Sequence, residues 1–142
     1  MEANKKAPVY YSDRITINSS AQNVWNKLSD IENWPKWQKN IEYARLNGKL
    51  ASQTTFDWKS GSSKIHSTLH TVKAPIEIGW TGKSMGINAV HNWKISSMGN
   101  TTEVFVEESM EGILANLMKG YLNKIVKREL QKSLSELKLA CE

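Results

Sequence analysis

The sequence predicts an α+β fold in which one antiparallel sheet packs against a long C-terminal helix. Three observations predict it: an alternating apolar segment near the start, turn residues at strand-like intervals through the middle, and an apolar stripe with helical spacing after residue 112. The connections in the middle are too short for parallel crossovers. We therefore expect an antiparallel meander.

The first strand is expected over residues 9–17, where apolar and polar residues alternate. Two short helices follow it. Ser19 stands three residues before Gln22, which predicts a capping box at the start of the first helix. Asp30 is expected to cap the second helix, which breaks quickly because Pro35 disfavours helical geometry at the residue before it.

Turn residues divide the middle of the chain into six further strands. Their expected bounds are 41–47, 53–59, 64–73, 76–82, 87–97 and 102–110. Alternation within these strands assigns an inner face, unless a bulge inverts it. The residues expected to face inward are Phe56, Trp58, Ile76, Ile78, Trp80, His91, Trp93, Ile95, Val104, Val106, Glu108 and Met110.

The last element is expected to be one helix from residue 113 to about residue 139, judged by its helical period. Its apolar stripe needs a partner, and the concave face of the twisted sheet can supply one. Gly120 inside the helix costs about 1 kcal/mol relative to Ala, which indicates a bend or a close approach there. This packing would enclose a volume between sheet and helix, where small ligands commonly bind.

Length and composition limit the class of protein. A chain of 142 residues is suited to a single domain, here residues 1–142. The lone Cys141 excludes an intrachain disulfide and a thiolate zinc cluster. No apolar stretch approaches the roughly 18 residues of a membrane span, and no apolar secretory leader is visible. We therefore expect a cytoplasmic protein without stable membrane insertion.

Two stretches of sequence indicate a family. The segment Asp30-Ile31-Glu32-Asn33-Trp34-Pro35-Lys36-Trp37 follows the stretch 15–25, and later His91-Asn92-Trp93-Lys94-Ile95 precedes the stretch 102–112 that leads into the last helix. This arrangement resembles the polyketide cyclase/dehydrase branch of the START-like superfamily, also called pollen-allergen-like or SRPBCC. The resemblance covers nearly the whole chain.

The resemblance implies a helix-grip fold. In that fold a seven-stranded antiparallel sheet wraps around a long C-terminal helix, with two short helices between the first and second strands. It also implies a hydrophobic cavity for lipids, polyketides or aromatic molecules. The superfamily contains cyclases, hydratases, carriers and receptors, so the resemblance does not choose between catalysis and binding.

The expected inner face brings His91 and Glu108 together on adjacent strands. The candidate ligand-binding residues around them are Phe56, Ile78, Trp58, Trp80, Trp93, Met118 and Tyr121. Burial of apolar ligand surface would supply affinity, and the polar groups would orient the ligand. The first alternative is a cyclase or dehydratase that uses His91 and Glu108 as general acid and base. The plain interpretation is that the two side chains only hydrogen-bond each other or a ligand, or lie at the mouth of the cavity.

The remaining features suggest other classes of function. The chain has 19 basic and 14 acidic residues, a net charge of +5, and the last helix has a basic face typical of a module that touches membranes or nucleic acid. Glu129 and Glu136 interrupt that face, which favours simple solvation, and no nucleic-acid partner is expected. A monomer and a homodimer both remain open.

Two further interpretations concern histidine and tryptophan. His66 and His70 would lie about 13 Å apart along one strand, too far to bind one metal ion, and no cofactor is expected. Trp25, Trp34 and Trp37 fall in the helical segment, where packing explains them. We expect Trp34 and Trp37 to form a packed corner; the alternative is an exposed ring that serves as a lid or touches a membrane.

Overall fold

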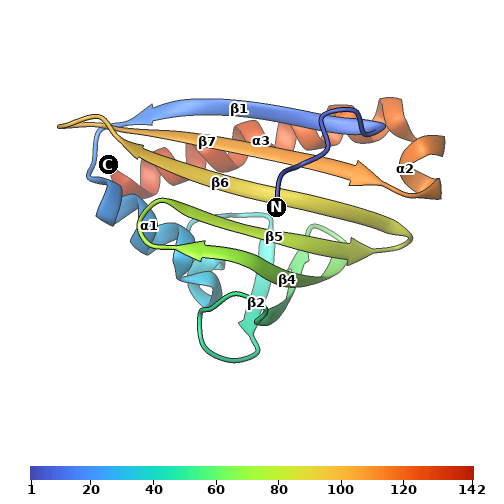
Figure 1. Ribbon diagram of the computed structural model, residues 1–142, viewed down its shortest axis with the longest axis horizontal. Coiled ribbons are helices and arrows are strands. Elements are labelled where there is room, and N and C mark those ends of the chain that lie inside the picture. Colours follow the sequence, from blue (N-terminus) through green and yellow to red (C-terminus); the bar gives the residue numbers. More distant parts are fainter.

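The computed structural model describes residues 1–142 and contains one seven-stranded antiparallel sheet with the order β1-β7-β6-β5-β4-β3-β2. The strands are β1 (Val9–Ile17), β2 (Ile41–Leu46), β3 (Thr55–Ser60), β4 (Ser63–Lys73), β5 (Glu77–Ser84), β6 (Ile87–Ser97) and β7 (Thr102–Glu111). Strands β2 to β7 form a meander, and β1 pairs with β7 at the far edge (Figure 1). The predicted fold class is confirmed.

The helices pack on one face of the sheet, which is the inner face. They are α1 (Ala21–Ser29), the 3-10 helix η1 (Ile31–Lys36), α2 (Ile113–Leu117) and α3 (Lys119–Cys141). Helix α3 lies behind β1 and β7 in Figure 1 and packs mainly on β1. Helix η1 packs on β2, and α1 contacts both α3 and β6. No helix is long and apolar enough to cross a membrane.

The expectation of one unbroken C-terminal helix is wrong at Met118, where φ is −114° and ψ is 26°. Upstream of the break, Gly112 has a φ of +114°, and a Cβ atom there would come within 2.5 Å of the Gly86 carbonyl oxygen. This close approach holds the start of α2 against the β5–β6 turn, whereas α3 follows β1. Gly120 faces open space, so the approach expected there does not occur.

The helix caps also differ from those expected. Ser20, and not Ser19, caps α1, because its Oγ accepts a hydrogen bond from the Asn23 backbone N–H at 3.1 Å. The Ser19 hydroxyl accepts instead from the Asn23 side-chain amide. Asp30 precedes η1, but its carboxylate accepts from the Asn33 side chain and makes no backbone cap.

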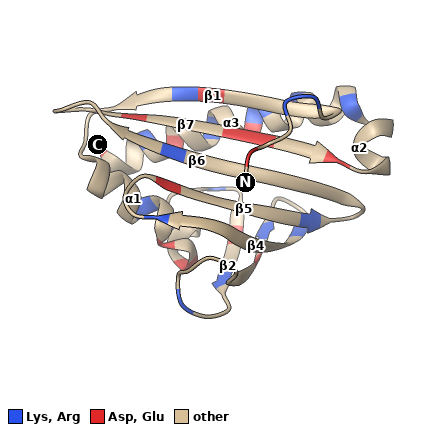
Figure 2. Ribbon diagram, in the orientation of Figure 1, with Lys and Arg blue, Asp and Glu red and all other residues tan.

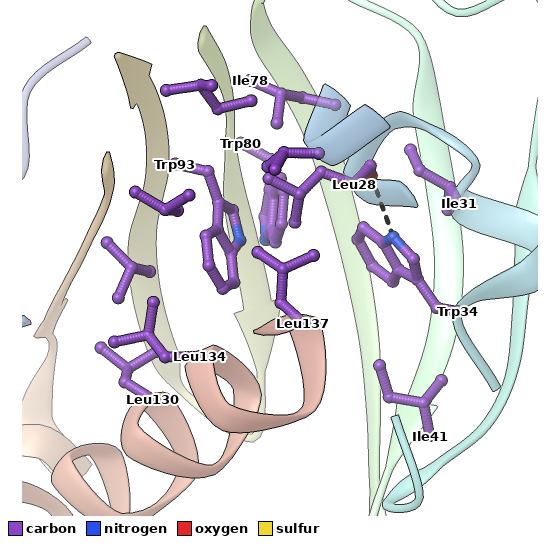
Figure 3. Close-up of a cluster of buried hydrophobic side chains, with 14 of the residues drawn as sticks. Leu28, Ile31, Trp34, Ile41, Ile78, Trp80, Trp93, Leu130, Leu134 and Leu137 are labelled. Atoms are coloured by element: carbon purple, nitrogen blue, oxygen red, sulfur yellow. Dashed lines mark hydrogen bonds between the residues drawn. The ribbon is translucent and has the colours of Figure 1, made fainter. Parts of the chain in front are cut away.

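Most of the predicted inner face forms the core, but Trp58, Glu108 and Met110 are only partly buried and Ile76 is exposed. Phe56, Ile78, Trp80, His91, Trp93, Ile95, Val104 and Val106 are all buried. Leucine side chains of α3 point toward Trp80 and Trp93 from the other layer (Figure 3). The expectation that Ile76 faces inward is wrong. Strand β5 begins only at Glu77, and Ile76 is 58% exposed.

The first residues of the chain lie on the outer face of the sheet, in front of β6 in Figure 1. The Asn92 side-chain amide donates to the Met1 carbonyl at 2.9 Å, and the Asn4 backbone N–H donates to the Ser109 hydroxyl at 3.1 Å. Ala3 is buried as a result. No pattern in the sequence predicted that this segment would pack on the sheet.

Beneath this segment lies a buried carboxylate, Glu107. It accepts hydrogen bonds from the Tyr10 hydroxyl at 3.0 Å and from the Asn92 amide at 2.9 Å. Burial by itself raises the pKa of Glu107, but hydrogen bonds from Asn92, Tyr10 and the Ala3 N–H, with Lys94 nearby, outweigh it and hold the pKa below its ordinary value.

We predict that the free energy of unfolding depends on pH through the ionisation of Glu107. A depressed pKa means that the unfolded chain binds more protons, so this contribution is present above the ordinary Glu pKa of about 4.3 and is lost as the pH falls through the folded-state pKa. Glu107→Gln should cost about 1 to 3 kcal/mol at neutral pH, because an amide cannot accept at both ends. Urea unfolding at several pH values should show this cost shrinking on acidification.

The matched control for that measurement is Glu103→Gln. Glu103 lies on the same face of β7, but its only ion pair, to Arg14, is exposed to solvent. Exposed pairs contribute little, so we expect a cost below about 1 kcal/mol. A Glu107→Gln cost that stays constant from neutral to acid pH would contradict the prediction.

Candidate functional site

The strand register places three predicted site residues in one row across the sheet. Trp80 of β5 lies directly opposite His91 of β6, and His91 lies directly opposite Glu108 of β7. All three side chains share the inner face, because directly opposed residues of an antiparallel pair point to the same side. The structure therefore brings together the acid and base candidates that the sequence singled out.

His91 is held on two sides. Its Nδ1 lies 2.6 Å from Glu108 Oε1, and its ring stacks on Trp80 with centroids 4.6 Å apart and planes 4° from parallel. The side chains of His91 and Glu108 are only 9% and 17% exposed. The carboxylate favours a proton on Nδ1, so Nε2 of the neutral ring is a hydrogen-bond acceptor.

His91 Nε2 is buried and has no hydrogen-bond partner. A buried polar atom left without a partner costs about 1 to 3 kcal/mol, so native structures keep few of them. Here the atom sits on a ring that Trp80 and Glu108 already orient. The arrangement is suited to accept a hydrogen bond from a bound molecule, or to transfer a proton to one.

Aromatic rings pack tightly beside the row. The Trp34 ring lies 5.6 Å from Phe56, 5.5 Å from Trp58 and 5.2 Å from Trp80, measured between centroids. Most of these pairs meet edge to face, the arrangement that aromatic quadrupoles favour. The half-buried Trp58 donates its indole N–H to the Ser67 hydroxyl at 3.0 Å. Of these rings, Trp58 is the one that retains partial exposure.

Sequence reasoning missed the place of Trp34 in this cluster. It is 2% exposed, and its indole N–H donates to the Leu28 carbonyl at 3.0 Å (Figure 3). Helix η1 places the Trp34 ring against the inner face of the sheet. Trp37 remains half-buried at the expected corner. Pro35 signalled the break in the chain, but the direction of the turn depends on packing against β3 and β5.

Two predicted ligand-binding residues lie elsewhere. Met118 and Tyr121 were expected to surround the His91–Glu108 pair, yet both are exposed, Tyr121 by 59%. Met118 lies at the break between α2 and α3, and Tyr121 lies in the first turn of α3, away from the buried residues of that helix, which begin at Val126. Ile78, by contrast, is fully buried in the core.

The two main hollows of the surface do not lie between the sheet and α3. The first, of about 180 Å³, is lined by Lys27, Asp30, Asn33, Lys36 and Trp37. The second, of about 100 Å³, is lined by Glu2, Ala3, Lys5, Lys94, Phe105 and Glu107. Both have mainly polar linings. The side chains around the row pack against one another, so a ligand there would have to displace some of them.

The other two histidines lie outside this site. His66 Nδ1 is 2.7 Å from Asp57 Oδ1 at an exposed position. The His70 side chain lies over Gly79, beside Asn92. Burial, together with the positive charge of the N-terminal amine, lowers the pKa of His70.

Comparison with known proteins identifies the family. Residues 9–142 match the family described as polyketide cyclase / dehydrase and lipid transport. The chain therefore belongs to that family, which confirms the resemblance. No curated protein matches the sequence.

Several solved structures share the fold at low sequence identity. A hypothetical protein jhp0584 from Helicobacter pylori superposes with a TM-score of 0.85 at 16% identity, covering 97% of this chain and 90% of that one. A START superfamily protein from Mycobacterium smegmatis gives 0.82 at 15%, covering 93% and 96%. The Zhui aromatase/cyclase from Streptomyces sp. R1128 gives 0.81 at 11%, covering 91% and 90%.

We predict that Trp34 is a principal support of the site. Trp34→Phe removes the hydrogen bond to the Leu28 carbonyl and part of a ring that contacts three others, so it should cost about 2 kcal/mol or more in urea unfolding. Trp37→Phe makes the same exchange at a half-buried position and should cost less than about 1 kcal/mol. Equal costs for the two variants would contradict this role.

Proposed function

We propose that residues 1–142 form one ligand-binding domain that takes up a hydrophobic small molecule on the inner face of the sheet. The molecule would be a lipid, polyketide or aromatic compound with one polar group. The observation that carries the proposal is the buried His91 Nε2, which has no partner and lies beside an aromatic cluster. Membership of a family of cyclases and lipid carriers supports it.

The chemistry of the row suggests how such a ligand would be oriented. With the proton on Nδ1 held by Glu108, His91 Nε2 accepts a hydrogen bond from a ligand hydroxyl or amine. A protonated His91 would instead donate from Nε2 to a carbonyl. The surrounding rings would supply affinity through burial of apolar surface, at about 25 cal/mol per Å². Trp58, as the partly exposed ring of the cluster, is the proposed side of entry.

A second candidate function is catalysis, and one observation favours it. The Glu108 carboxylate hydrogen-bonds His91 Nδ1, which leaves Nε2 of the same ring free to accept or donate a proton. A ring-closing or dehydrating enzyme needs such a group. In this alternative His91 is the general acid or base, and Glu108 orients it and stabilises the imidazolium. The solved aromatase/cyclase with this fold supports the alternative only by analogy.

Ligand binding is tested by native mass spectrometry of the purified protein and by thermal unfolding with added 2-naphthol or palmitate. We expect a retained hydrophobic molecule, and a melting temperature that rises with ligand concentration. Trp58→Ala should weaken binding at least about tenfold through lost apolar contact. Trp37→Ala, the same change at a half-buried position outside the ring cluster, should bind like wild type.

The proposal fails if wild type retains no molecule and neither probe raises its melting temperature. It also fails if Trp58→Ala binds as tightly as wild type. Circular dichroism of both variants shows whether they are folded, so a loss of binding is not confused with unfolding.

His91→Phe separates the two candidate functions. The phenyl ring keeps the stacking on Trp80 but removes Nε2, so ligand affinity should fall by no more than about tenfold, the worth of one neutral hydrogen bond. If the retained ligand is a substrate, its conversion, followed by mass spectrometry, should be abolished. Conversion that persists in this variant would remove His91 from the mechanism.

A further inference from the structure

Large apolar side chains gather at one end of the molecule, outside the core. We call this surface the α2 edge. It consists of Met85 in the β5–β6 turn and Ile113, Leu117, Met118 and Tyr121 on α2 and the start of α3. Ile113 is 80% exposed and Leu117 76% exposed. Apolar side chains clustered in this way on a surface are typical of a site that binds another protein or a membrane.

The fold holds this edge together. Helix α2 is anchored on its inner side by the buried Ala115, so Ile113 and Leu117, one turn apart, face outward. The close approach of Gly112 to the Gly86 carbonyl keeps the β5–β6 turn, and with it Met85, beside the start of α2. The apolar groups are therefore presented by a braced surface and not by a free end of the chain.

Basic residues border the α2 edge. Between residues 112 and 128 the chain contains no acidic residue, and its basic residues there are Lys119, Lys124, Lys127 and Arg128. Lys83 lies two residues before Met85, near the end of β5. Figure 2 shows basic segments on both sides of this end, at the end of β5 and along the start of α3. Glu111, just before α2, accepts a hydrogen bond from the Asn4 side chain.

This charge pattern decides between possible partners. A second copy of the chain seated on the same edge would bring these basic residues against one another. An anionic lipid surface would complement them, because apolar side chains enter the acyl boundary while lysines reach the phosphate headgroups. We propose that the α2 edge docks reversibly on the surface of an anionic membrane. Docking goes beyond the proposed ligand binding and requires no occupied ligand site.

The experiment is sedimentation of the full chain with phosphatidylcholine vesicles, with and without phosphatidylglycerol. We expect binding only to the vesicles that contain phosphatidylglycerol, weakened by added salt. Leu117→Ser should reduce the partition coefficient by about tenfold, because it removes an inserted apolar side chain. Lys119→Glu with Lys124→Glu should reduce it further, by about fivefold or more per position.

Leu139→Ser is the matched control. Leu139 is also 80% exposed and lies on α3, but near the opposite end of that helix from the α2 edge. This variant should bind like wild type. Because all four substituted side chains are exposed, the variants should keep their far-ultraviolet circular dichroism.

Three outcomes would overturn the proposal. The first is no binding of wild type to anionic vesicles. The second is equal binding by Leu117→Ser and Leu139→Ser, which would mean nonspecific attraction of a basic protein. The third is a concentration-dependent dimer in sedimentation equilibrium that Leu117→Ser abolishes, which would assign the edge to a second copy of the chain.

Discussion

The row formed by Trp80, His91 and Glu108 across three neighbouring strands is the interaction on which the account depends. It exists only because the hairpins β5–β6 and β6–β7 have the register that opposes these residues directly. A shift of one residue in either hairpin would put His91 and its neighbour in the row on opposite faces of the sheet. The same register places Glu107 and Asn92 together beneath the N-terminal segment. The register of the β6–β7 hairpin therefore determines the side-chain pairs on both faces of the sheet.

Most of the fold could be predicted because its signals are local. Alternation located the strands, and turn residues located the connections to within about two residues. The break at Met118 could not be found this way, since the helical period of apolar residues continues through it. The contact that holds the start of α2 in place joins Gly112 to Gly86, and these two residues are distant in sequence. The packing of residues 1–4 on the outer face was hidden for the same reason.

The part of the site that lies on the strands was predictable, because it depends only on which face of the sheet each side chain occupies. His91, Glu108, Trp80 and Phe56 could be placed because alternation within a strand fixes the side on which each lies. Trp34 could not, because its position depends on how η1 turns under the sheet. Met118 and Tyr121 were misplaced because the apolar stripe predicted one continuous helix, whereas the structure has two, α2 and α3. Their exposure is what defines the α2 edge.

The central claim is that His91 Nε2 meets a ligand, and nuclear magnetic resonance of the imidazole nitrogens tests it most directly. The chain has three histidines, so their signals can be assigned by substitution. Titration with the molecule that raises the melting temperature should shift the Nε2 signal of His91 and leave His66 and His70 unchanged. Saturation with that molecule without any change at His91 would contradict the account.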